Sequence, residues 1–419
     1  MVANLTTPLL GIVATIAIGR LGDAILLGGV AMASVIFDCL FWLFAFLRMS
    51  TVAFTAQSLG AGETSELRAI LVRGFIVAAL IGAALIVLQI PLASLLFGAM
   101  GGSEGVTRAA KAYFTIRIWS APLALANYVM LGWLVGQARA RLALGTQITI
   151  NLTNVAATVL LVLVLDLGIA GAAIAAVIAE AAGLLLGIWI AQRLSHGRAA
   201  ISRATLFDRT KLMRLLAVNR AILIRTAALI AAFLFFTAQG ARAGDVTLAA
   251  NAVLNNFLMI SGFFLDGLAN AAEQLCGRAT GARDKAGFAA AVRLVLIWGF
   301  GFALAVAAIF ALGGTTLIDI MTASAEVRRV ARDYLPFVVF APLLGVFAFA
   351  YDGVYIGATW ARDMRNLMLL SLVIFLAAWF SLRSFGNAGL WGALLVHYAA
   401  RGGLEALRYP TLLKASFKE

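Results

Sequence analysis

The sequence predicts an all-α, polytopic membrane protein. Its twelve transmembrane helices form two six-helix bundles related by a pseudo-two-fold axis along the membrane normal. Hydrophobic residues make up 63% of the 419 residues and charged residues only 12%, whereas soluble domains hold roughly 25% charged residues. Apolar runs of about 20 residues, long enough to cross a bilayer core of roughly 30 Å, recur along the chain. Short motifs also repeat at a shift of about 221 residues.

The apolar segments predict helices rather than a barrel, because they do not alternate polar with apolar residues and lipid leaves no partner for open backbone groups. In chain order they cover residues 1–19, 26–57, 70–97, 111–136, 142–165, 168–192, 215–239, 247–277, 288–312, 328–356, 366–384 and 387–407.

Basic residues concentrate in alternate loops, above all in the longest one, "QRLSHGRAAISRATLFDRTKLMR". The positive-inside bias places this loop and both termini in the cytoplasm, as in a multi-pass protein of a bacterial-type inner membrane. The same bias accounts for the net charge of +13, so we expect no nucleic-acid partner. No cleavable signal peptide is expected, because the first segment has no basic region before it.

Three pairs of motifs recur in the same order and at the same places in the helix count. They are "RLGD" and "RAGD" (Arg20–Asp23, Arg242–Asp245), "SLGAGE" and "ATGARD" (Ser58–Glu63, Ala279–Asp284), and "GQARAR" and "GATWAR" (Gly136–Arg141, Gly357–Arg362). Each half holds six spans, so both halves have the same orientation. The prediction is a first bundle at 1–192, a basic linker at 193–214, and a second bundle with a short tail at 215–419. Parallel repeats of this kind place their sites between or inside the bundles, near the midplane.

Several classes of function lack their motifs. The chain has no Walker loop to bind ATP and no paired catalytic group, so we expect a protein that is not an enzyme. Cys39, Cys276, His196 and His397 have no spacing typical of a disulfide framework or a metal site.

Polar residues inside apolar spans are candidate sites, because an ionisable group in lipid is costly. Segment 247–277 carries such a stripe on one helical face: Asn251, Asn255, Asp266, Asn270 and Glu273. The stripe predicts either an ion site or a polar seam that holds the second bundle together. Glu180, in "VIAEAAG", has the same two interpretations, with the structural one favoured.

The motifs "NLTTPLLG", "IGRLGD", "FAFLRMSTVAFTAQSLGAG", "FLDGLANAAEQLCGRATGAR" and "YDGVYIGATWARDMRN" resemble the DinF-like branch of the MATE (multidrug and toxic compound extrusion) transporters. The resemblance runs over nearly the whole length. It implies two bundles in a V with a central cleft, and export of small organic, often cationic or amphipathic compounds. It also implies a drive by inward H⁺ or Na⁺ and no other cofactor.

The chain departs from that family at its coupling acids. Family members begin with a longer N-terminal segment, so the first helix here is expected to be truncated. On helix one the family has an acid in "LLGLVDT", and this chain has Ala14 at that position. On helix five the family has an Asn followed four residues later by an Asp. This chain keeps the Asn as Asn154 but has Thr158 in place of the Asp. A buried carboxylate suits proton exchange, whereas alanine and threonine do not titrate in this range.

Asp38, halfway along the second span, stands where the family has Asn. It is either a relocated coupling acid or a structural partner of Asn127 or Arg48. Arg48 itself is expected to hold the bundle together rather than to contact substrate. The resemblance supports Asp352 as an inward-facing acid that contacts ion or substrate.

The remaining predictions concern the cleft and the helix bends. The substrate-cleft candidates are Thr7, Ala14, Met49, Asn151 and Asn255. Asn270 and Arg48 are predicted to be polar partners within the bundles. Helix bends are expected at Pro8, Gly11 and Pro122, where they either serve gating or are static.

The favoured interpretation is an H⁺- or Na⁺-coupled antiporter that works as a monomer by alternating access. Two alternatives remain. One is a degenerate or truncated family member without coupled transport, and the other is a flippase of lipid-linked precursors with the same superfold.

Overall fold

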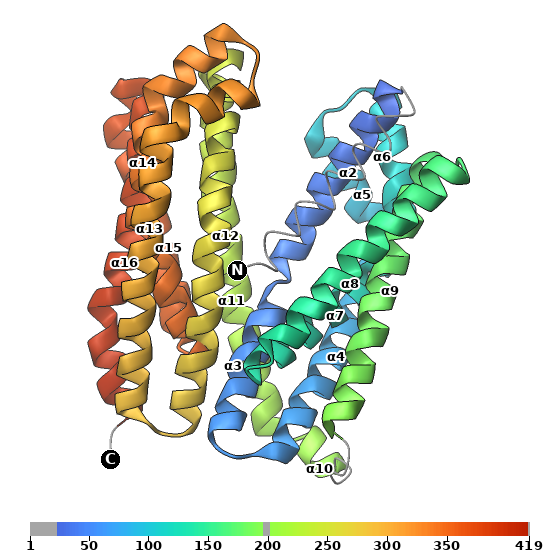
Figure 1. Ribbon diagram of the computed structural model, residues 1–419, viewed down its shortest axis with the longest axis vertical. Coiled ribbons are helices and arrows are strands. Elements are labelled where there is room, and N and C mark those ends of the chain that lie inside the picture. Colours follow the sequence, from blue (N-terminus) through green and yellow to red (C-terminus); the bar gives the residue numbers. More distant parts are fainter. Residues whose placement is uncertain (1–22, 196–201, 418–419) are drawn as a thin grey trace. The chain divides into compact units, whose positions relative to one another are not determined.

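The computed structural model describes residues 23–195 and 202–417, and every regular element in these ranges is a helix, as predicted (Figure 1). Ten stretches of the described chain are long and apolar enough to cross a membrane. The first predicted segment, 1–19, lies outside the described residues. The last two, 366–384 and 387–407, fall within one apolar stretch, Ala361–Ser416. The number twelve therefore stays a prediction.

The described residues form two compact units, and the division along the chain falls between Arg214 and Leu215. We call them the first bundle (23–59 and 63–214) and the second bundle (60–62 and 215–417). The division lies inside a single continuous helix, Arg209–Arg242.

The first described helix of this bundle is capped at its N-terminus, because the Asp23 side chain accepts hydrogen bonds from the amides of Ile25 and Leu26. Its elements are α2 (Ala24–Leu43), α3 (Phe46–Gly60), α4 (Thr64–Val87), α5 (Gln89–Met100), α6 (Glu104–Arg117), the 3₁₀ turn η1 (Ile118–Ser120), α7 (Ala121–Gly136), α8 (Ala140–Thr158), the π-helical turn η2 (Val159–Val164), α9 (Gly168–Ser195) and α10 (Arg203–Leu206). Helix α2 packs on α6, α4 on α7 and α8 on α9.

Pro122 lies in the first turn of α7, directly after η1, where a missing backbone N–H costs no helical hydrogen bond. Its ring packs against Gly82 of α4, at which a Cβ atom would lie 2.5 Å from the Cα of Pro122. The proline therefore sits at the junction of two helical segments and at a close helix contact.

The second bundle is built from longer helices. They are α11 (Arg209–Arg242), α12 (Asp245–Gly281), α13 (Lys285–Met321), α14 (Ala325–Gly357), α15 (Ala361–Leu382), the 3₁₀ turn η3 (Arg383–Phe385) and α16 (Gly386–Ser416). Helix α14 packs on α12, α13 and α16, and α15 packs on α16. Gly353 lets α14 approach α12 closely, since a Cβ there would lie 2.3 Å from the carbonyl oxygen of Ala269.

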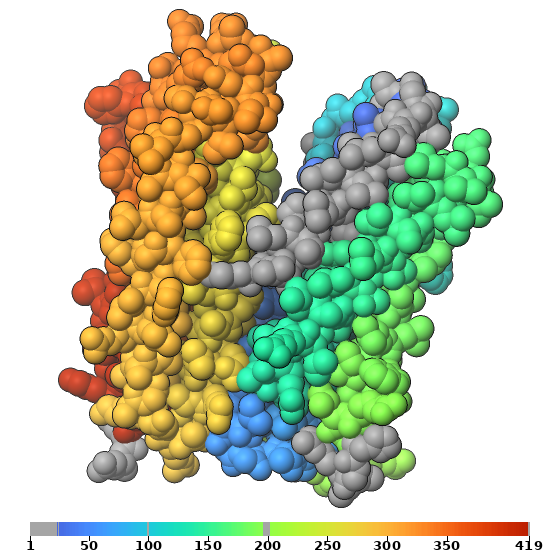
Figure 2. Space-filling model, in the orientation of Figure 1, coloured from blue at the N-terminus to red at the C-terminus, as the bar shows by residue number. Residues whose placement is uncertain are grey.

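Apolar side chains are exposed where a soluble protein would carry charges. On α13, in the yellow-orange part of Figure 2, the exposed side chains include Leu294, Ile297, Trp298, Leu304 and Leu312. Such an outer surface fits lipid as the surrounding solvent. The interior of the second bundle is packed with aromatic residues, among them Phe257, Phe310, Phe375 and Trp391.

Candidate functional site

Asp352 of α14 is the centre of a buried charged network in the second bundle. Its Oδ2 atom contacts the Nη2 atoms of both Arg225 of α11 and Arg401 of α16. All three residues are at most 4% exposed. Removing charges from water is costly unless they are paired and hydrogen-bonded. The Asp352 carboxylate pairs with both arginines and so links α14 to α11 and α16.

Glu405 lies one helical turn beyond Arg401 on α16 and is fully buried. Neither of its carboxyl oxygens has a hydrogen-bond partner among the described residues, and the same is true of Asp352 Oδ1. Its backbone carbonyl accepts a hydrogen bond of 2.7 Å from the Tyr355 hydroxyl of α14. The carboxyl group is close enough to Arg401 and Arg225 to interact electrostatically with both.

Sequence reasoning identified Asp352 but missed Arg225, Arg401 and Glu405. The signal that identified Asp352, an ionisable residue inside an apolar span, was also present for these three residues. Arg225 lies in "LIRTAALI", and Arg401 and Glu405 lie in "AARGGLEAL". We call these four residues the second-bundle cluster.

Two acids of the predicted stripe on α12 lie next to this cluster. Glu273 is buried and Asp266 is exposed, and both interact electrostatically with Arg225. The stripe therefore brings two further acids close to Arg225. Asn255 and Asn270 of the same stripe are half-buried.

Asn251, at the other end of the stripe, is part of a polar seam. Its side chain exchanges two hydrogen bonds with the Asn387 side chain, at 2.8 and 3.0 Å, and accepts a third from Trp391 Nε1 at 2.9 Å. Gly240 of α11 leaves space for it, because a Cβ there would lie 2.9 Å from Asn251 Nδ2. These contacts join α12 to the first turns of α16.

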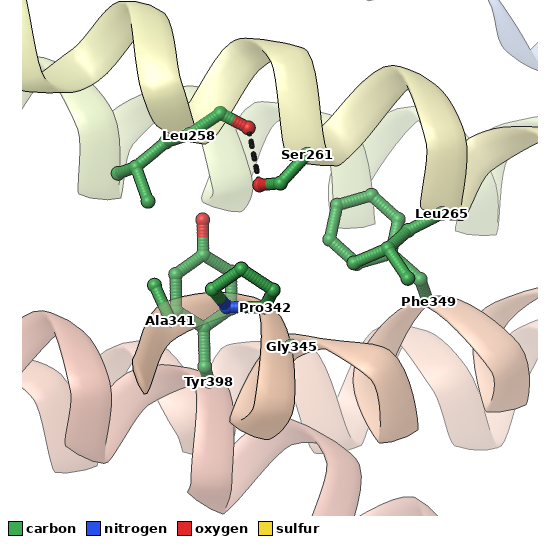
Figure 3. A pocket seen from close by; sticks show the side chains of 8 residues that line it. All are labelled: Leu258, Ser261, Leu265, Ala341, Pro342, Gly345, Phe349 and Tyr398. Atoms are coloured by element: carbon green, nitrogen blue, oxygen red, sulfur yellow. Dashed lines mark hydrogen bonds between the residues drawn. The ribbon is translucent and has the colours of Figure 1, made fainter. Parts of the chain in front are cut away.

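A small cavity of about 10 Å³ lies between α12, α14 and α16 (Figure 3). Its lining is Leu258, Ser261, Leu265, Ala341, Pro342, Gly345, Phe349 and Tyr398. The figure shows the Tyr398 hydroxyl and the Ser261 side chain pointing into the space beside Pro342. This volume is close to the smallest that holds one water molecule.

In the first bundle, Glu180 of α9 binds Asn127 of α7. The Asn127 amide donates to Glu180 Oε2 at 2.6 Å and to the Glu180 backbone carbonyl at 2.8 Å. Arg117, at the end of α6, is the charged group that interacts electrostatically with this carboxylate. Asn127 Oδ1 has no partner among the described residues.

Asp38 is exposed on α2. Arg117 also lies near it, with its guanidinium carbon 4.7 Å from the centre of the adjacent Phe37 ring and a hydrogen bond of 3.1 Å to the Tyr113 hydroxyl. Arg117 thus interacts electrostatically with both Asp38 and Glu180.

The helix-five positions of the family comparison lie on α8. Asn151, Asn154 and Thr158 are buried, and Gln147 donates to Asn151 Oδ1 at 3.2 Å. The Thr158 hydroxyl has no hydrogen-bond partner in the described chain, and η2 begins at the next residue. A π-helical turn at such a position is typical of functional sites.

The other predicted positions are less informative. Arg48 and Met49 are half-buried on α3. Thr7, Pro8, Gly11 and Ala14 lie outside the described residues. Within the described ranges no three His, Cys, Asp or Glu side chains are grouped as a metal site.

Long apolar helices that bury ionisable networks are typical of polytopic membrane transporters. The MatE family model matches residues 1–160 and 221–379, and the chain belongs to that family. It is a transporter of the MATE multidrug efflux class rather than an enzyme, and a multi-pass membrane protein.

Individual relatives agree with this assignment. The chain is 38% identical to DNA damage-inducible protein F of Escherichia coli (strain K12) over 96% of this chain and 87% of that protein. It is 25% identical to Protein DETOXIFICATION 43 of Arabidopsis thaliana over 73% of this chain and 58% of that protein.

Solved structures show the same fold at lower identity. A crystal structure of MATE in complex with MaD5 has a TM-score of 0.90 at 19% identity, covering 100% of this chain and 94% of that one. An outward-facing conformation of a multidrug resistance MATE family transporter of the MOP superfamily has a TM-score of 0.82 at 19% identity, covering 100% and 96%.

Proposed function

We propose that the protein is an antiporter that exports small organic compounds, cationic or amphipathic, in exchange for inward H⁺ or Na⁺. It would work by alternating access of its two bundles, as a monomer in a bacterial-type inner membrane with cytoplasmic termini. The observation that carries this proposal is the second-bundle cluster. Four buried ionisable groups on three helices are costly in a protein surrounded by lipid, and such groups mark ion pathways.

The first bundle supports the same function by other residues. Ala14 and Thr158 stand where the family resemblance leads one to expect acids, so neither can exchange a proton. Glu180 and Asp38 remain as carboxylates, on α9 and α2, and Arg117 lies near both. We infer that these two acids, which share Arg117 as a charged neighbour, carry ion coupling in this bundle.

Transport by purified protein in liposomes tests the proposal. A pH gradient or a Na⁺ gradient is imposed separately, and efflux of a fluorescent organic cation is followed. We expect one of the gradients to drive efflux in the parent protein and Asp38→Asn to abolish that drive. Asp245→Asn, which alters an exposed acid at the start of α12, is the matched control and should transport normally.

The outcomes separate the alternatives. Efflux that follows neither gradient in the parent, but follows one in Ala14→Asp, would show a degenerate family member and contradict coupled antiport. Normal gradient-driven efflux in Asp38→Asn would exclude Asp38 and leave Glu180 as the first-bundle acid. Movement of a labelled lipid-linked precursor without any cation efflux would indicate a flippase.

A further inference from the structure

The carboxyl group of Glu405 is buried in a place that does not support a charge. An ionised carboxylate is stable in an apolar interior only when it is paired and hydrogen-bonded, whereas a neutral carboxyl costs far less. Glu405 is 0% exposed, and neither oxygen accepts a hydrogen bond from any described residue. The arrangement therefore fits the protonated, neutral form.

The two nearby arginines could stabilise the ionised form, but in this structure both are bound to Asp352. Arg401 and Glu405 are four residues apart on α16, the spacing at which side chains on one helix face meet. Arg401 instead reaches across to α14, and the Nε atoms of both Arg401 and Arg225 lack partners in the described chain. A second arrangement, with Arg401 on Glu405 and Arg225 on Asp352, would give each carboxylate one guanidinium.

We propose that Glu405 is the proton-carrying group of the second bundle, and that losing its proton draws Arg401 from Asp352 to Glu405. The inference rests on the proposed function: it names the proton as the coupling ion and Glu405 as the residue that carries it in the second bundle. In the protonated state Arg401 ties α16 to α14 through Asp352. When the proton passes to water, Arg401 forms an ion pair within α16, and that tie between the helices is lost.

The charges around Glu405 favour a proton over a metal cation. Na⁺ bound at Glu405 would remain a separate cation beside two guanidinium groups, whereas a proton bonds to a carboxyl oxygen and leaves a neutral group there. A proton also needs a single oxygen, and a carboxyl group provides it. Asp352 has two guanidinium contacts in this arrangement.

Titratable and charged groups from several helices interact electrostatically with Glu405 or with its neighbours. Glu405 itself interacts with Arg225 of α11, Arg401 of α16, and Tyr351 and Tyr355 of α14. Its neighbours interact in turn with other groups: Arg225 with Asp266 and Glu273 of α12, Tyr355 with Asp363 of α15 and Arg408 of α16, and both arginines with Asp352. Asp363 and Arg408 bind each other, with 2.9 Å between Arg408 Nε and Asp363 Oδ1. Arg401 is thus the cation that can move to Glu405 along its own helix.

The small cavity lies beside this cluster. Tyr398 lines it one turn before Arg401 on α16, and Phe349 both lines it and has its ring centre 5.5 Å from the Arg401 guanidinium carbon. A water molecule there would have the Tyr398 hydroxyl within the same small space (Figure 3). Meanwhile the Tyr355 hydrogen bond to the Glu405 backbone keeps the helices in register while Arg401 changes partner.

Infrared spectroscopy of the protein in liposomes tests the proposal independently of transport. A protonated carboxyl group gives a C=O stretching band that shifts in D₂O and disappears when the group ionises. We expect such a band in the parent at neutral pH and its loss in Glu405→Gln. The band should persist in Glu326→Gln, which alters an exposed acid in the first turn of α14. Asp352→Asn should also lose it, because Arg401 is then released from α14 and Glu405 is the acid one turn away on its own helix.

A band that is unchanged in Glu405→Gln would overturn the proposal. If that variant does not fold, Glu405→Asp replaces it, and a band at an unchanged frequency would overturn the proposal equally. Proton-driven efflux should be lost in Glu405→Gln, and normal efflux there would refute its role in coupling. A Glu405 band in a parent that transports nothing would leave the protonation standing and reject the proposed function instead.

Discussion

Replacing Asn251 by alanine removes the polar seam between α12 and α16 at a single position. The side chain takes part in three hydrogen bonds, two with Asn387 and one with Trp391. Both partners are buried, so neither finds water when Asn251 is truncated. The substitution should therefore destabilise the second bundle without touching the charged cluster.

The expected size follows from the number of bonds. Side-chain hydrogen bonds in membrane proteins average about 0.6 kcal/mol, so three give about 2 kcal/mol. Since about 1.4 kcal/mol is a factor of ten, the unfolding equilibrium should shift roughly 30-fold. Orphaned buried donors add to this, and Trp391 Nε1 would be one of them.

The assay is equilibrium unfolding in mixed detergent micelles, with Asn256→Ala as the matched control. Asn256 lies on the same helix, is exposed, and donates only to the backbone carbonyl of Ala252 at 3.0 Å. A difference between the two variants below about 0.5 kcal/mol would refute the seam, because independent surface changes fall in that range. Retained efflux in Asn251→Ala would further separate the seam from the ion site.

Three other substitutions test separate parts of the molecule. Glu180→Gln should lower gradient-driven efflux about tenfold or more in the liposome assay, because a buried acid in a span is functional by default, and full activity would exclude it. Gly353→Ala should destabilise the second bundle by about 1–3 kcal/mol in the unfolding assay, because the added methyl group overpacks the contact with α12. Gly403 has open space around it, so Gly403→Ala should not destabilise the bundle. Equal effects of the two substitutions would contradict the close contact at Gly353. Arg73→Ala removes the guanidinium contacts to the α10 backbone carbonyls. Hydrogen exchange of the α10 amides should then become faster by on the order of tenfold, whereas Arg209→Ala should leave it unchanged. Unchanged exchange in Arg73→Ala would show that other contacts hold α10.

Hydropathy and motifs are sufficient to determine the class of this protein. Lipid allows few backbone conformations, so long apolar runs specify helices locally. The same logic located Asp352, Glu273 and Glu180 as acids inside spans, since a charge there stands out against apolar neighbours. The family followed from motifs spread along the chain.

Only the tertiary structure decided what these residues contact. Arg225 and Arg401 lie 127 and 49 residues from Asp352 in the sequence, and nothing local indicates that both bind one carboxylate. The α12 stripe looked uniform, yet Asn251 joins a seam while Glu273 lies beside the cluster. The physical reason is that the cost of a buried charge depends on its partners, and partners from distant segments are brought together by helix packing.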